Sequence, residues 1–133
     1  MITCEDDKYL DPCIFYLKEL LPLELIPDVD IILAELDNNF AYIEQEEQDK
    51  YDITLDKLSD PEFNLIRVLA HECVHVKQYV LRELVDTPTH YMWMGKIHDL
   101  NCAYRDCPWE KEAYELENIL YDKYKNHINN IND

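Results

Sequence analysis

The stretch LIRVLAHECVHV, from Leu65 to Val76, decides how this chain folds. Its apolar residues surround two histidines and a glutamate in the pattern H-E-x-x-H, His71 to His75. Residues four apart in an α-helix lie on the same face, so the two imidazoles would project together. Because buried ionisable groups are rare unless they are paired or bound to a metal, the apolar flanks predict a buried helix that holds a metal ion.

The motif supplies two metal ligands and a base for hydrolysis. Two imidazoles can bind one Zn²⁺ at about 2.0–2.1 Å each. Glu72 follows the first ligand, where it can accept a proton from a metal-activated water. The alternative is a solvated helix with two unrelated histidines, and the apolar flanks argue against it. Cys73, on the opposite side of the helix, is expected to be a small buried apolar residue.

Length and composition predict a single domain over residues 1–133. Hydrophobic residues make up 47% of the chain, which is enough for a substantial core. The formal net charge is −17, with 29 acidic against 12 basic residues. Such a field repels nucleic-acid phosphates and anionic membranes and favours basic partners. The single glycine, Gly95, excludes a glycine-rich phosphate loop.

The cysteines and the first residues bear on the compartment. Five cysteines, an odd number without C-x-x-C spacing, indicate free thiols in a reducing environment. The start of the chain, MITCEDDKYL, lacks the apolar segment of a signal peptide. No run approaches 18 apolar residues, so no membrane span is expected. We therefore expect a cytoplasmic protein.

The sequence pattern predicts an α+β fold, in which the H-E-x-x-H helix and a C-terminal helix pack against a small antiparallel sheet of about three strands. The expected elements are a helix opened by Asp11-Pro12 and ended by Pro22, strands over 29–36, 40–44 and 51–55, a helix from about Pro61 to about Leu84, a hairpin over 91–100 around Gly95, and a helix from Trp109 to about Asn126. The first two strands are expected to pair across 37–39. The acidic stretch 44–52 is expected to be a solvated turn or strand end, and the last five residues a frayed tail.

A catalytic zinc site needs a third protein ligand and an open position for water. The candidates downstream of the motif are His90, His98, Asp99, Asp106, Glu110, Glu112, Glu115, Glu117 and His127. Glu110 lies in the first turn of the C-terminal helix, three residues before the small Ala113, which would let two helices approach closely. Glu112 is the rival, since both carboxylates flank the apolar stripe of this helix about equally. Helical geometry alone does not separate Glu110 from Glu112.

Three segments of the chain, LAHECVHVKQY, WMGK and PWEKEAYELE, resemble the small SprT-like or ImmA-like zincin metallopeptidases of phage and bacterial genomes. The resemblance covers about the C-terminal half of the chain. In the glutamate-ligand (gluzincin) pattern the third ligand stands three residues before a small Ala, which implies Glu110. Many gluzincins carry Asp or Asn after that Ala, where this chain has Tyr114. The resemblance implies a minimal zincin-like fold with one Zn²⁺ per chain, bound by His71, His75 and Glu110, and the host cytoplasm for a phage-encoded protein.

The predicted function is zinc-dependent hydrolysis of peptide bonds, with Glu72 as the general base. The substrate would be a protein or peptide, and a basic one if the anionic surface attracts it. Tyr79, Tyr104 and His98 are candidates for stabilising the transition state or for supporting the ligands, and His98 is a further candidate ligand. The alternative is a catalytically silent zinc-binding module on a zincin scaffold that binds a protein partner. Glu72 favours the enzyme, and the small size of the chain favours the binding module.

Overall fold

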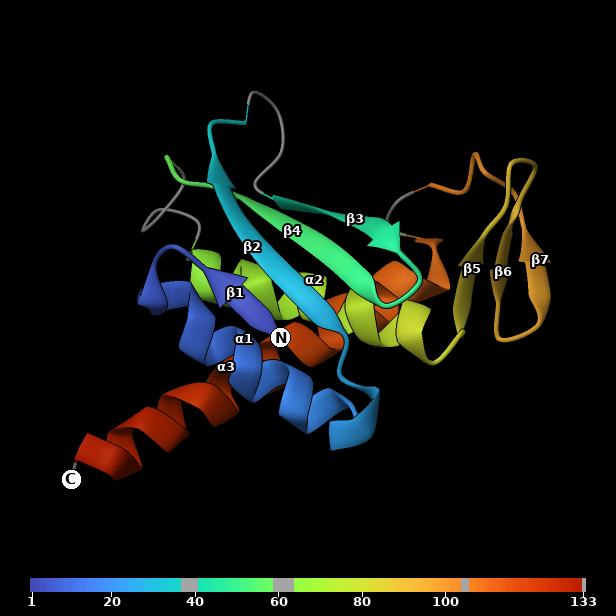
Figure 1. The fold of residues 1–133 in the computed structure, drawn as a ribbon. Helices are drawn as coiled ribbons and strands as arrows, with labels where there is room; N and C mark the ends of the chain where they lie inside the picture. Colours follow the sequence, from blue (N-terminus) through green and yellow to red (C-terminus); the bar gives the residue numbers. More distant parts are fainter. Residues whose placement is uncertain (37–40, 59–63, 104–105, 133) are drawn as a thin grey trace.

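The computed structural model describes residues 1–36, 41–58, 64–103 and 106–132 of the chain. Within these ranges the fold is α+β (Figure 1), with three α-helices, a mixed four-stranded sheet and an antiparallel three-stranded sheet. The predicted fold class is therefore confirmed. Among the same residues, no helix is long and apolar enough to cross a lipid bilayer.

The larger sheet has four strands and is mixed rather than antiparallel. Its order is β1 (Ile2–Cys4), β2 (Asp28–Ala34), β4 (Lys50–Asp56) and β3 (Ala41–Glu47). β2 runs parallel to both β1 and β4, and β3 runs antiparallel to β4. The predictions of a purely antiparallel sheet, and of a hairpin between the first two predicted strands, are wrong. The sequence of β3, AYIEQEE, explains its place, because an acidic strand suits the solvated edge of a sheet while the apolar β2 and β4 lie inside.

The acidic stretch over 44–52 is more ordered than predicted. β3 extends to Glu47 and β4 begins at Lys50, so only a short turn separates them. The register shifts between Gln45 and Glu47, which is a β-bulge. The predicted turn over 37–39 lies outside the described residues.

The first helix, α1 (Asp7–Leu20), begins earlier than predicted. Asp6 is its N-cap, and the Asp6 carboxylate accepts a hydrogen bond from the backbone N–H of Lys8 at 3.0 Å. Pro12 therefore lies inside the helix and not at its first turn. An earlier start is stabilising because it buries Tyr9, which is 5% exposed.

The motif helix is α2 (Leu65–Val80), and it is shorter than predicted at its C-terminal end. Arg82 adopts a left-handed backbone with φ of 58°, which turns the chain out of the helix. Strand β5 (Leu84–Asp86) follows where the helix was predicted to continue. The predicted start at Pro61 falls outside the described residues, and Asn64 precedes the helix with φ of 52°.

The small sheet consists of β5, β6 (Tyr91–Trp93) and β7 (Lys96–His98) in that order. The predicted hairpin around Gly95 is confirmed, and its turn places Met94 and Gly95 at φ of 51° and 82°. The last helix, α3 (Pro108–Asn132), starts as predicted but continues through the predicted frayed tail. In Figure 1 its C-terminal part extends beyond the rest of the molecule.

α1 and α2 pack on one face of the main sheet, and α3 lies against α2. The core between these layers is apolar. It includes Val29, Ile31, Tyr51, Ile53 and Leu55 from the sheet, and Leu17, Leu65, Leu69 and Val76 from the helices. The sheet and α1 cover one part of the α2 surface, and α3 covers another. The histidines of α2 lie at the contact with α3.

Candidate metal centre

His71, His75 and Glu110 meet between α2 and α3. One carboxylate oxygen of Glu110, Oε1, lies 3.0 Å from His71 Nε2 and 3.1 Å from His75 Nε2. All three residues are buried, with exposed fractions of 6%, 6% and 8%. Their ligand atoms lie within 4.8 Å of one another. This buried cluster could hold a metal ion.

The geometry of the cluster fits a small divalent metal. A tetrahedral zinc with ligands at about 2.1 Å separates its ligand atoms by about 3.4 Å. The two N–O distances of 3.0 and 3.1 Å approach this separation, so small side-chain movements would admit an ion. Two imidazoles and a carboxylate form a donor set that zinc accepts, with a fourth position left for water. Other divalent metals that bind nitrogen and oxygen ligands accept it as well.

The second ring nitrogen of His71 faces a carboxylate that the sequence prediction did not assign to it. His71 Nδ1 lies 3.3 Å from Glu117 Oε1, and the other Glu117 oxygen lies 3.8 Å from Arg67 Nε. Ionised carboxylate oxygens only accept hydrogen bonds, so the two carboxylates on either side of the ring favour the doubly protonated form of His71. Burial alone would lower the pKa of His71, but the hydrogen bonds to Glu110 and Glu117 outweigh it and raise this pKa to about 9.

The second ring nitrogen of His75 faces an amide. His75 Nδ1 lies 2.8 Å from Oε1 of Gln78, which is fully buried. The Gln78 Nε2 group donates to the Trp109 carbonyl at 2.9 Å and to Glu112 Oε1 at 3.1 Å. Gln78 therefore fixes the orientation of His75 and attaches it to the first turn of α3, where Glu110 lies.

The contacts between the three side chains shift their pKa values. Burial raises the pKa of Glu110, but the hydrogen bonds from His71 and His75 outweigh it and bring that pKa down to about 2. Burial lowers the pKa of His75, but its hydrogen bond to Glu110 and the negative charges of Glu72 and Glu110 together outweigh this effect and raise the pKa. A metal ion would displace the two Nε2 protons and leave the Nδ1–H groups on Glu117 and Gln78. Such partners orient metal-binding histidines in proteins.

Sequence reasoning missed these roles of Gln78 and Glu117, although a signal was present. Glu117 follows Glu110 by seven residues, or two helical turns, so both carboxylates lie on one face of α3. Gln78 follows His75 by three residues and lies on the same face of α2. Two polar side chains placed in phase with predicted ligands, within otherwise apolar faces, were the available signal.

Glu72 is buried beside the cluster, with an exposed fraction of 7%. Burial raises the pKa of its carboxyl group, against the lowering effect of the charges on His75 and His71. Among the described residues, none forms a hydrogen bond that holds this carboxylate. A buried carboxylate with a raised pKa is suited to taking up a proton.

The remaining predicted site residues contact other groups. Glu112 accepts hydrogen bonds from Lys77 Nζ at 2.9 Å and from Gln78. The Tyr79 hydroxyl donates to Asp86 at 3.0 Å, and the His98 ring packs edge-on against Trp109, with 5.6 Å between ring centroids. Tyr104 lies outside the described residues. Of the two rival glutamates, Glu110 is the one that the structure brings to both imidazoles.

Tyr114 and Cys73 occupy the surroundings of the motif. The Tyr114 ring lies edge-on to the His71 ring, with 4.8 Å between centroids. Cys73 is fully buried, as expected, and its sulfur lies 3.8 Å from the sulfur of Cys13 in α1. All five cysteines are free thiols.

Comparisons with protein-family models, with curated proteins and with solved structures found no match to this chain. The resemblance to zincin metallopeptidases therefore remains a prediction from three sequence segments.

Proposed function

We propose that this protein is a zinc-dependent peptidase of the zincin kind, with His71, His75 and Glu110 as metal ligands and Glu72 as the general base. The observation that carries the proposal is the convergence of two imidazole Nε2 atoms on one buried carboxylate oxygen. Replacing a buried group of charged residues with well-packed apolar residues is often neutral or stabilising. Stability of the fold therefore does not explain this cluster. Metal binding gives the cluster a purpose.

The chemistry follows from the residues around the cluster. A zinc ion held there would supply a Lewis acid and lower the pKa of a bound water toward ~7. Glu72 accepts the proton of the attacking water while the carbon–oxygen bond forms, and returns it to the amine as the carbon–nitrogen bond breaks. Glu117 and Gln78 hold the two imidazoles in place through their Nδ1–H groups. The free thiols are consistent with action in the cytoplasm.

The test separates an enzyme from a zinc-binding module. Elemental analysis of the purified protein should give about one zinc per chain, and incubation with proteome-derived peptides should yield new termini. The Glu72→Gln variant should keep its zinc and lose cleavage by a factor of about 10² to 10⁴, as expected for loss of a general base. Glu115→Gln, which removes the same charge from an exposed position on α3, is the matched control.

Each outcome has a definite meaning. Cleavage that survives in Glu72→Gln contradicts the assignment of the base. One zinc per chain without cleavage by the wild-type protein supports the binding module instead. A folded protein that binds no divalent metal rules out both functions.

A further inference from the structure

Two buried thiols that the proposed mechanism does not use meet between α1 and α2. Cys13 of α1 and Cys73 of α2 are both 0% exposed, and their sulfur atoms lie 3.8 Å apart. The two residues are 60 positions apart in the sequence, so their contact depends on the packing of the two helices. Both belong to the apolar core of the protein.

The two sulfur atoms are close enough for a covalent link to form with little rearrangement. The S–S bond of a disulfide is about 2.05 Å long, so the sulfur atoms would have to approach by about 1.8 Å. Rotation about the two Cα–Cβ bonds and a small shift of α1 against α2 can supply this movement. Thiols form only weak hydrogen bonds, so the present contact adds little to stability that a covalent link would not greatly exceed.

The place of the two thiols in the chain would give a link between them a large effect on stability. The segment between Cys13 and Cys73 contains β2, β3 and β4, which are three of the four strands of the main sheet. A disulfide stabilises a fold mainly by restricting the unfolded chain, and the effect increases with the length of the closed loop. This link would therefore close a loop around most of the main sheet.

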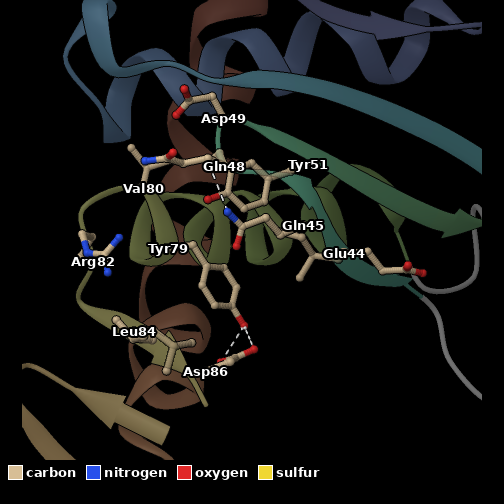
Figure 2. A pocket seen from close by; sticks show the side chains of 12 residues that line it. Glu44, Gln45, Gln48, Asp49, Tyr51, Tyr79, Val80, Arg82, Leu84 and Asp86 are labelled. Atoms are coloured by element: carbon tan, nitrogen blue, oxygen red, sulfur yellow. Dashed lines mark hydrogen bonds between the residues drawn. The ribbon is translucent and has the colours of Figure 1, made fainter. Parts of the chain in front are cut away.

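A dissolved oxidant does not reach the pair through the groove of the protein. This groove, of about 660 Å³, lies beside the C-terminal end of α2 (Figure 2), and neither thiol is among the described residues that line it. Its lining on α2 consists of Tyr79 and Val80, more than one helical turn beyond Cys73. The thiols therefore react only when the packing between α1 and α2 opens locally.

We propose that Cys13 and Cys73 are a reversible redox pair, which a low-molecular-weight disulfide converts to a disulfide bond between α1 and α2. One thiolate of the pair attacks a sulfur atom of the small disulfide, forms a mixed disulfide and releases the first small thiol. The other thiolate attacks the protein sulfur of this mixed disulfide, forms the Cys13–Cys73 bond and releases the second small thiol. The protein gives up two electrons and two protons, and the small disulfide takes them up.

The redox pair links the stability of the fold to the surroundings. In a reducing compartment the thiols stay free, as they are in the structure. Where small disulfides accumulate, the bond forms during local openings and the linked protein then resists unfolding. Cys73 lies on the opposite side of α2 from the imidazoles, so the proposal holds whether or not the cluster of His71, His75 and Glu110 binds a metal.

The other three cysteines offer competing links. Cys4 of β1 is half-buried and packs against the same core as Cys13. The Cys107 sulfur lies 3.5 Å from the Cys102 carbonyl oxygen, but a link between these two residues would close a loop of only four residues. Such a short loop restricts the unfolded chain much less. A large gain in stability on oxidation therefore distinguishes the Cys13–Cys73 link from the Cys102–Cys107 link.

Peptide mapping tests which link forms. Full-length protein, as purified, is incubated with excess oxidised glutathione, and protein kept in reduced glutathione is the reference. Proteolysis without reductant, followed by mass spectrometry, should identify a peptide pair that joins Cys13 to Cys73 and that dithiothreitol separates. The link should form slowly, and faster in urea below the unfolding transition, because both thiols are buried. A predominant link from Cys4 to Cys13, or no link from Cys13 to Cys73 even in this urea, would overturn the proposal.

Urea unfolding tests the effect of the link. Oxidation should lower the equilibrium constant for unfolding by about 30-fold or more, as is typical of a disulfide that closes a long loop. The gain should disappear in Cys13→Ala and in Cys73→Ala. Each variant is compared with its own reduced form, so any destabilisation by the substitution itself cancels.

Cys4→Ala and Cys102→Ala are the matched controls, because each removes a thiol from outside the pair, and both should keep the full gain. Linked wild-type protein that is no more stable than the reduced protein would overturn the proposal. So would a gain that survives in Cys73→Ala. Neither measurement depends on zinc or on peptide cleavage, so the outcome is separate from that of the proposed function.

Discussion

The two faces of α2 are both buried, yet they are built from opposite chemistry. Leu69, Cys73 and Val76 face the sheet and α1 and are 0% exposed. On the other side, His71, His75 and Gln78 face α3 and are almost as buried. Apolar burial stabilises a fold by roughly 25 cal/mol per Å², whereas polar groups must find partners to avoid a cost.

The buried polar groups on this face of α2 have the hydrogen-bond partners that burial requires. Each ring nitrogen of both histidines has a partner, and the Gln78 amide has three. One side of α2 thus stabilises the fold through apolar packing, and the opposite side carries a cluster that could hold a metal ion. The two faces should therefore respond differently to substitution.

The largest effect is expected on the apolar face. Leu69→Ala should lower the free energy of unfolding by about 2–5 kcal/mol, since it leaves a cavity in a fully packed site. The amount of zinc bound per folded molecule should stay the same. Urea unfolding with zinc analysis measures both quantities, and Leu23→Ala, at a position that is 74% exposed, is the control. Loss of zinc from folded Leu69→Ala protein would show that the faces are not independent.

On the polar face, the strongest effect is expected at Glu110. Glu110→Gln should weaken zinc binding by about 100-fold or more, because it removes the negative charge of the carboxylate that lies 3.0 and 3.1 Å from the two imidazole Nε2 atoms. Glu112→Gln is the matched control, since Glu112 contacts Lys77 and Gln78 instead. Competition with a chelator of known zinc affinity gives both constants. A larger loss in Glu112→Gln would reassign the third ligand.

Smaller losses are expected from the groups that hold the imidazoles. Glu117→Gln and Gln78→Ala should each weaken zinc binding by about 10- to 100-fold, as is typical of residues behind metal ligands. Glu117→Gln keeps the shape of the side chain, so its effect reports on charge and orientation. The same competition measurement applies, with Glu115→Gln as reference. Affinity unchanged in both variants would mean that the two Nδ1–H contacts do not orient the site.

The smallest effect concerns pH. In the metal-free protein the pKa of His71 is about 9, against 6.5 for the free side chain, and that of Glu110 is about 2, against 4.5. The interaction between His71 and Glu110 therefore contributes its full share of the free energy of unfolding between pH 4.5 and 6.5. Its contribution is lost as pH rises through about 9 or falls through about 2.

Urea unfolding of the metal-free protein between pH 6 and 10 should show this loss of stability, and His71→Gln should flatten the profile. Zinc affinity should change in the opposite direction and increase with pH, because zinc displaces protons. Zinc affinity that is independent of pH from 6 to 9 would contradict the assignment of an imidazolium to His71.

Much of the apolar face was predictable from sequence, and much of the polar face was not. The spacing of H-E-x-x-H within Leu65–Val76 predicts a buried helix, and Pro108 marks the start of α3 as observed. The contacts of Gln78 and Glu117 depend on how α2 and α3 cross, which helical periodicity does not specify. The place of β3 in the sheet could not be deduced either, because strand order depends on long-range pairing. The turn residues at 37–39 favoured a hairpin between the first two predicted strands.

The end of α2 shows a similar limit. Helix propensity favours continuation through LRELV, but Leu84 is 2% exposed beside Trp109, and its burial requires the chain to turn at Arg82. Tertiary packing here outweighs local preference.

The left-handed backbone of Arg82 and Met94 has a practical consequence for engineering. A non-glycine residue in that conformation is strained by about 1 kcal/mol, and this chain has only Gly95 to relieve such positions. Met94→Asn and Arg82→Gly are therefore candidate thermostabilising changes. The Met94 change, on an exposed hairpin tip, can be introduced before any of the destabilising variants, so that each of them is studied in a background with stability to spare.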